Sequence, residues 1–313
     1  MKKLLAALLA VFLLAGCSAR PQPQAKNDTL HILCTTYPVY LFTTAVTQGV
    51  EGVEVSLLVN SQTSCLHDYT LTVNDMKAIE GADVIVMNGA GLEEFMVDAL
   101  SHSHANLIDC SEGVELLEEV DDDHGHHGHD HDDDEDDFDP HIWMDPHNAA
   151  IMVENIAAGL AELLPEEGER LEANRQAALT PLNARLSLPP TIGVATPFDL
   201  SALQGLPLIT FHDGFQYFAR AYGLDLLKAI EEEEGATASA SEIKEIVELV
   251  RERNIPAIFT ERNGSAATAE AIAAETGCTV YELDMIMSGD GTGIQPYITA
   301  MLSNLFAIQE AFQ

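Results

Sequence analysis

Basic residues are scarce in this 313-residue chain, which contains 14 Lys and Arg against 51 Asp and Glu. A formal net charge of −37 leaves no basic surface to neutralise phosphates, so we expect no nucleic acid partner. The acidic balance makes cations the natural ligand class. Because 47% of the residues are hydrophobic, the chain is able to bury a full core, and its length predicts about two domains.

Several motifs are also missing. The cysteines have no C-x-x-C spacing, which leaves a cysteine zinc knuckle unsupported. The chain contains neither H-E-x-x-H nor G-x-S-x-G, the signatures of two large hydrolase classes. The N-terminal apolar run, residues 4–14, is about half the ~20 residues that span a bilayer, so a retained transmembrane helix is not expected.

The N-terminus, "MKKLLAALLAVFLLAGC", has the basic start and short apolar run of an export signal. "LAGC" resembles the bacterial lipobox, which implies a signal peptide over 1–17 and acylation of Cys17. A plain signal peptide that happens to end at this cysteine is the alternative. The polar residues 18–28 then form a flexible linker. We therefore expect an extracytoplasmic protein, lipid-anchored to the bacterial cytoplasmic membrane.

Short apolar runs of strand length alternate with helical patterns along most of the chain, which is typical of parallel sheets flanked by helices. The expected strands are 30–37, 53–60, 82–89 and 105–110, then 206–212, 224–230, 255–261 and 278–284. Ser239 and Glu242 form a capping-box pattern before another helix. We predict an α/β fold of two lobes, 29–164 and 189–313, joined by a long helix over 165–188 with Pro181 as a kink.

Residues that can bind a metal lie at the ends of several expected strands. In the second lobe these residues are His212, Glu261 and Asp284, and in the first lobe His67 follows the second strand. His141 precedes a predicted helix at 149–163. Because ligands bind outside the carboxyl ends of parallel strands, we expect a metal site in the cleft between the lobes. Three imidazoles and one carboxylate would complete a tetrahedral zinc shell and leave no position for a reactive water.

Four motifs resemble the zinc-binding cluster A-I solute-binding lipoproteins of ABC importers, in the order of that family. They are "CTTYPVY" (34–40), "FDPHIWMDPHNA" (138–149), "FHDGFQYFARAYGL" (211–224) and "AIFTE" (257–261). The resemblance implies that Zn²⁺ is captured by His67, His141 and His212, with Asp284 as a carboxylate ligand or close to the metal. It also implies an ABC permease as partner, and we expect a monomer that performs no catalysis.

The sequence departs from the family around His67. "SCLHDYTLTVND" replaces the usual proline-rich segment and brings Cys65 two residues before the histidine. We interpret Cys65 as a disulfide partner of Cys34, with a thiolate ligand as the alternative. The pairing of Cys110 and Cys278 stays open. Asp68 is either an acceptor that orients an imidazole or a solvated residue.

Residues 121–137 form a tract of Asp, His and Gly with no means of building a core, so we expect a loop. Its five histidines are His124, His126, His127, His129 and His131. Such a loop is able to bind several zinc ions weakly and thereby collect scarce metal, or it is an acidic insertion that binds metal incidentally. His147 is expected in the first turn of a helix and not as a ligand. His102 and His104 are expected at the surface, with a weak auxiliary metal site as the alternative.

The sequence leaves three alternative functions open. A manganese-binding member of the same family is the first, although a site rich in imidazole nitrogen favours zinc. An exported zinc-dependent hydrolase, with Glu261 as general base, is the second, and a closed four-ligand shell argues against it. The third is a cell-adhesion or metal-storage protein whose acidic loop does the binding.

Overall fold

The computed structural model of the chain describes residues 29–59, 69–118, 138–187, 200–230, 238–262 and 266–313. The expected signal peptide with Cys17, the segment that contains Cys65, His67 and Asp68, and the histidines of 121–137 lie outside these residues. Among the helices that are described, none has the length and apolar character needed to cross a membrane.

The N-terminal half forms a four-stranded parallel sheet in the order β2-β1-β3-β4. Its strands are β1 (Leu30–Cys34), β2 (Val53–Leu57), β3 (Val84–Met87) and β4 (Asn106–Asp109). β1 and β3 occupy the centre, and their side chains Ile32, Leu33, Val84 and Ile85 are buried. This explains why these strands read as continuous apolar runs, because a parallel sheet is covered on both faces.

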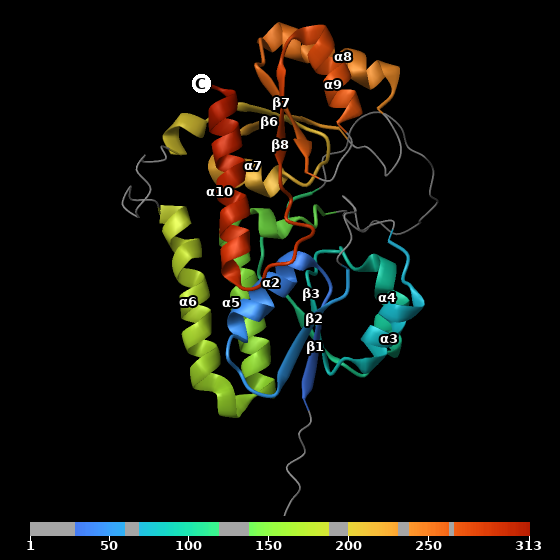
Figure 1. Ribbon diagram of the computed structural model, residues 1–313, viewed down its shortest axis with the longest axis vertical. Coiled ribbons are helices and arrows are strands. Elements are labelled where there is room, and N and C mark those ends of the chain that lie inside the picture. Colours follow the sequence, from blue (N-terminus) through green and yellow to red (C-terminus); the bar gives the residue numbers. More distant parts are fainter. Residues whose placement is uncertain (1–28, 60–68, 119–137, 188–199, 231–237, 263–265) are drawn as a thin grey trace, which may run out of the picture.

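The C-terminal half repeats this arrangement with a second four-stranded parallel sheet in the order β6-β5-β7-β8. Its strands are β5 (Pro207–Thr210), β6 (Asp225–Ala229), β7 (Ala257–Glu261) and β8 (Thr279–Leu283). Each of the eight strands lies within one of the apolar runs expected from the sequence. The prediction of two α/β lobes with parallel sheets is confirmed (Figure 1).

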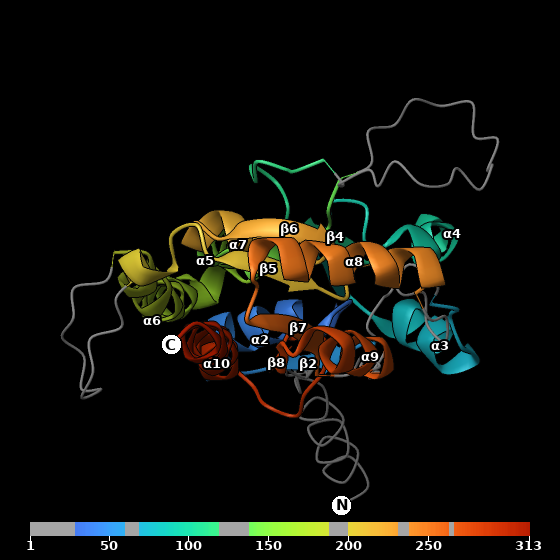
Figure 2. The ribbon, with the colours of Figure 1, turned by 90° about the horizontal axis from the view of Figure 1, so that it is seen from above.

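Helices cover both sheets, and three of them gather on one flank of the molecule, on the left in Figure 1 and Figure 2, where α6 packs against both α5 and α10. The helices of the first half are α2 (Tyr37–Val46), α3 (Val73–Gly81), η1 (Glu94–Met96), α4 (Val97–His102), η2 (Ile142–Met144) and α5 (Pro146–Leu163). Those that follow are η3 (Pro165–Glu167), α6 (Gly168–Ser187), η4 (Leu200–Leu203), α7 (Gln216–Tyr222), α8 (Ala240–Arg253), α9 (Ala267–Thr276) and α10 (Ile294–Ala311). The helix expected over 165–188 is therefore η3 followed by α6, and Pro181 lies within α6.

The main hydrophobic core runs through both lobes instead of dividing between them. Trp143, from η2, is fully buried and donates a hydrogen bond from Nε1 to the Met285 carbonyl after β8, at 2.9 Å. The Tyr297 hydroxyl of α10 donates to the Trp143 carbonyl at 2.7 Å. These contacts join η2 to the second lobe, so the residue before η2, His141, lies where the lobes meet. A smaller core lies under α8 and α9.

Candidate metal centre

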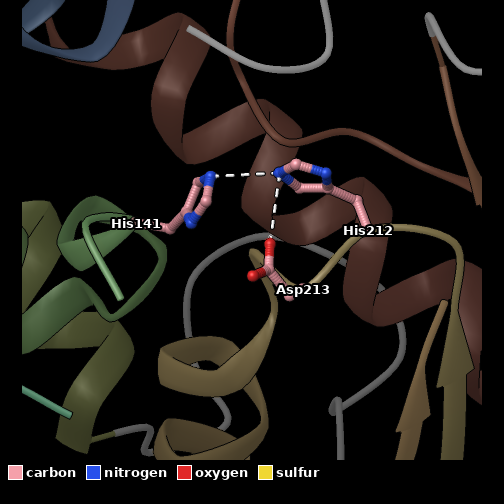
Figure 3. Close-up of side chains that lie close together, drawn as sticks. All are labelled: His141, His212 and Asp213. Carbon is pink, nitrogen blue, oxygen red and sulfur yellow. Dashed lines mark hydrogen bonds and ion pairs between the residues drawn. The ribbon is translucent and has the colours of Figure 1, made fainter. Parts of the chain in front are cut away.

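His141 and His212 lie against each other at the junction of the lobes (Figure 3). Their Nε2 atoms are 3.2 Å apart, and their ring planes are nearly perpendicular at 89°. Both residues are buried, with exposed fractions of 3% and 7%. His141 is the N-cap residue of η2, and His212 follows β5. The fold therefore brings together two imidazoles that are 71 residues apart in the sequence.

The Asp139 carboxylate fixes the orientation of His141. Its Oδ1 accepts hydrogen bonds from the His141 backbone N at 2.9 Å and from Nδ1 at 2.8 Å. Because a carboxylate accepts only, Nδ1 carries the proton and the Nε2 lone pair of neutral His141 faces His212. Burial alone lowers the pKa of His141, but the hydrogen bond and charge of Asp139 outweigh it and the pKa is raised overall. A proton therefore competes with a metal ion for this ring.

Two carboxylates lie on different sides of the His212 ring. Asp213 Oδ1 is 3.5 Å from Nε2, the nitrogen that faces His141 (Figure 3). Glu261 Oε1 is 3.9 Å from Nδ1, the other ring nitrogen. In the described part of the chain, one group of side chains is close enough to hold a metal ion: His141, His212 and Asp213. Each of these residues has one possible ligand atom within 4.8 Å of those of the other two. Glu261 ends β7 and is buried.

Asp284, the carboxylate expected at this site, is not part of that group. It follows β8, but its Oδ2 pairs with Nη1 of Arg262, which follows the neighbouring strand β7. Its Oδ1 accepts a hydrogen bond from the Ile286 backbone N at 2.8 Å. Asp213 is not among the ligands expected from the sequence, although it directly follows His212 and aspartate is a metal-ligand type.

Gly214 leaves room for the His141 ring and for Met285 beside it. A Cβ atom built on this residue would lie 2.4 Å from Cε of Met285 and 2.9 Å from Cδ2 of His141. Contacts shorter than 3.0 Å between such atoms do not occur without displacement. The "DG" that follows His212 therefore supplies both a carboxylate and the space that the His141 ring occupies.

The remaining predicted residues fall in three groups. His67, Cys65 and the histidines of 121–137 lie outside the described residues, so their roles stay predictions. Cys34 is a free and fully buried cysteine in the core of the first lobe, and the disulfide expected between it and Cys65 stays a prediction because Cys65 lies outside the described residues. The three histidines that are not expected to bind metal at the cleft, His102, His104 and His147, are exposed.

Comparison with known proteins gives a consistent set of relatives. The profile of the family described as zinc-uptake complex component A, periplasmic (ZnuA), matches residues 32–311. The zinc-binding lipoprotein AdcA of Streptococcus pneumoniae serotype 4 is 32% identical over 98% of this chain and 60% of its own. The high-affinity zinc uptake system protein ZnuA of Bacillus subtilis is 30% identical over 97% of this chain and 95% of its own. The chain thus spans about three fifths of AdcA and nearly all of the Bacillus protein.

Solved structures agree with these relatives. A crystal structure of ZnuA matches with a TM-score of 0.74 and 27% identity, over 91% of this chain and the whole of that one. The crystal structure of Zn(II)-bound AdcA from Streptococcus pneumoniae matches with a TM-score of 0.70 and 27% identity, over 90% of this chain and 57% of that one.

Proposed function

Because the chain belongs to the family of zinc-uptake complex component A proteins, we propose that it captures Zn²⁺ outside the cytoplasm and delivers it to an ABC permease. The observation that carries the proposal is the pair of buried imidazoles whose Nε2 atoms are 3.2 Å apart. Two nitrogens bound to one tetrahedral zinc ion at 2.0–2.1 Å are about 3.3 Å apart. The observed separation is therefore close to what a shared zinc ion requires.

The proposed site contains His67, His141 and His212 together with one carboxylate, for which the resemblance indicates Asp284. A shell of four protein ligands holds the ion without leaving a position for a reactive water, so the protein binds and releases zinc and performs no catalysis. Three imidazoles favour zinc over manganese, because manganese prefers oxygen ligands. Zinc is the cargo of this protein and not a resident cofactor.

The proposed location follows from the N-terminal sequence. Cleavage before Cys17 and acylation of that cysteine would tether a monomer to the outer side of the cytoplasmic membrane, close to its permease. The histidines of the 121–137 loop would collect zinc weakly for transfer to the buried site, which needs neutral imidazoles to accept it. Manganese binding by the same site is the second candidate, and the titration below distinguishes the two.

The single tryptophan of the chain provides the measurement. The Trp143 ring is buried, and its centroid is 5.3 Å from that of His141, so metal at His141 changes its fluorescence. We expect metal-free protein lacking residues 1–17 to saturate at one equivalent of zinc in competition with a chelator. Deleting residues 121–137 should remove only weak zinc sites, so the Trp143 fluorescence change at one equivalent of zinc should persist.

The decisive variant is His212→Glu, with the exposed His102→Gln as its control. His212→Glu should weaken zinc binding at least tenfold and strengthen manganese binding, because an oxygen ligand replaces a nitrogen. His102→Gln should bind both metals like the wild type. Equal, weak and multiple zinc binding in all of these proteins, with no change in Trp143 fluorescence, would disprove the buried site.

A further inference from the structure

We propose that Tyr217 is a positioning residue for His141, and that its hydroxyl fixes this imidazole from the lobe that carries His212. The inference rests on the proposed function and adds to it a residue that does not bind the metal. Tyr217 is fully buried and belongs to α7 of the second lobe. Its hydroxyl contacts the backbone of the segment that leads to His141 in the first lobe.

The Tyr217 hydroxyl makes two hydrogen bonds, one as donor and one as acceptor. It donates to the Asp139 carbonyl at 3.0 Å and accepts from the Leu117 backbone N at 2.9 Å. In the sequence, these two partners lie on either side of the histidine-rich segment 121–137. Removing the hydroxyl would therefore take a hydrogen-bond partner from two backbone groups of the first lobe at once.

The two carbonyls that precede His141 are each held by a fully buried side chain. Tyr217 donates to the Asp139 carbonyl, and Asn88 Nδ2 donates to the Pro140 carbonyl at 2.9 Å. A hydrogen bond to a carbonyl restrains the whole planar peptide unit to which it belongs. The ring of Pro140 also fixes one of the two backbone angles between these units. The backbone that carries the His141 ring is thus restrained from two sides.

Only one of these two side chains reaches across the lobes. His212 follows β5, and the next element, α7, carries Tyr217. The Tyr217 hydroxyl therefore ties His141 to the part of the second lobe that holds His212, and supports the 3.2 Å separation of their Nε2 atoms (Figure 3). Asn88 belongs to the first lobe, where its backbone N donates to the Glu93 carboxylate at 2.7 Å. Of the two, Tyr217 is the residue that sets one imidazole relative to the other.

The test is Tyr217→Phe in the chain lacking residues 1–17, because phenylalanine keeps the ring and removes only the hydroxyl. The matched control is Thr44→Val. Thr44 Oγ1, on α2, accepts a hydrogen bond from the Gly293 backbone N at 2.8 Å, so this variant also loses a hydroxyl that joins the two halves, in a contact that does not involve the segment before His141.

Zinc affinity is measured by chelator competition with Trp143 fluorescence, and urea denaturation of metal-free protein gives the stability of each variant. We expect Tyr217→Phe to weaken zinc binding by about fivefold, the factor that corresponds to one typical hydrogen bond. Thr44→Val should bind zinc like the wild type. Both variants should be less stable than the wild type, so a difference in zinc affinity between them does not come from stability.

Cobalt(II) absorption provides a readout that a loss of stability alone would not change. Tyr217→Phe leaves every proposed metal ligand in place, so an altered visible spectrum of the Co²⁺-loaded protein reports a changed arrangement of those ligands. We expect an altered spectrum in Tyr217→Phe and the wild-type spectrum in Thr44→Val. Tyr217→Phe with wild-type zinc affinity, or with the wild-type cobalt spectrum, would overturn the inference while the proposed function stood.

The contact with Leu117 requires one further comparison, because this residue precedes the histidine-rich segment. Tyr217→Phe is therefore also measured in the chain that lacks residues 121–137 as well. The same loss of affinity there shows that the hydroxyl acts through Asp139 and His141, whereas disappearance of the effect would overturn the inference. A wild-type chain that binds no zinc at the buried imidazoles would instead overturn the proposed function.

Discussion

Gly214 shows how one residue without a side chain controls the position of a neighbouring imidazole, that of His141. In Gly214→Ala, the new methyl group would meet Met285 and the ring of His141 at less than 3.0 Å. We expect the ring to be displaced from its position opposite His212, and zinc affinity to fall by a factor of ten or more. Overpacking of this kind also costs about 1–3 kcal/mol of folding free energy. Chelator competition measures the first effect and urea denaturation the second.

The control for this prediction is Gly168→Ala. Gly168 is the first residue of α6, and nothing lies within 4 Å of a Cβ built there. Alanine in a helix is more favourable than glycine, so this variant should be as stable as the wild type or slightly more stable, with unchanged zinc binding. A Gly214→Ala protein that binds zinc as tightly as Gly168→Ala would show that His141 tolerates displacement.

At the level of single residues, the sequence singles out His141 and His212, which the structure brings together, but not the Asp213 carboxylate beside them. His141 and His212 are recognisable because each adjoins an element boundary in a family-like motif. Asp213 and Asp284 both follow strands, and spacing does not distinguish them. The difference depends on the direction of each side chain and on Arg262, whose guanidinium reaches Asp284 across two adjacent strands. Such a contact is set by the register of β7 and β8, which periodicity does not encode.

Among the elements, the capping box before α8 is both predicted and observed. Ser239 and Glu242 each accept a hydrogen bond from the backbone N of the other. Each apolar run expected to form a strand does contain one, but the strands are shorter than the runs. The run 82–89, for example, continues past the end of β3 at Met87 into a turn where Gly89 and Ala90 have positive φ angles of 78° and 53°. Hydrophobic periodicity does not detect this turn, because polar contacts from a later residue stabilise it.

That later residue is Glu93, a buried carboxylate. Its oxygens accept hydrogen bonds from the Thr35 hydroxyl at 2.6 Å and from the backbone N of Asn88 and Gly89 at 2.7 and 3.0 Å. Asn88 Nδ2 in turn donates to the carbonyl of Pro140, the residue before His141, at 2.9 Å. Burial raises the pKa of Glu93 to about 7, although these hydrogen bonds oppose the shift.

The raised pKa of Glu93 makes stability depend on pH. A carboxyl group that holds its proton more tightly when folded stabilises the protein below its unfolded pKa, near 4.5, and this contribution is lost as pH rises through about 7. We expect the wild type to lose up to about 3 kcal/mol relative to Glu93→Gln across this interval. Urea denaturation of metal-free protein at a series of pH values measures the difference, since other titrating groups are common to both proteins.

The exposed neighbour Glu94 provides the comparison for this prediction. Glu94→Gln removes the same charge from the next residue and should follow the wild-type pH profile in parallel. If the stability of Glu93→Gln also changes with pH in parallel to that of the wild type between pH 4.5 and 7, the pKa of Glu93 is not raised in the folded protein.

For the whole molecule, the sequence indicates two lobes but not how firmly they are joined. The predicted boundaries at 164 and 188 say where one lobe ends and the next begins along the sequence. They do not show the contacts between distant segments that connect the two halves. α10, at the C-terminal end, packs against α2 of the first half as well as against β8. The Tyr217 hydroxyl of α7 donates to the Asp139 carbonyl at 3.0 Å. These contacts join residues that are far apart in the sequence, so local sequence patterns do not predict them.

Tyr297 tests whether these contacts hold the lobes together. In Tyr297→Phe the Trp143 carbonyl loses the hydroxyl that donates to it, in a fully buried position, and this should cost about 1–3 kcal/mol of folding free energy. Because Trp143 also donates to Met285, we expect amide hydrogen exchange to accelerate both in η2 and in the segment after β8. Tyr281→Phe, on a half-buried tyrosine of β8, serves as the control and should leave exchange in η2 unchanged. Faster exchange confined to α10 would mean that this hydrogen bond stabilises only its own helix, and that packing of the shared core alone joins the two lobes around His141 and His212.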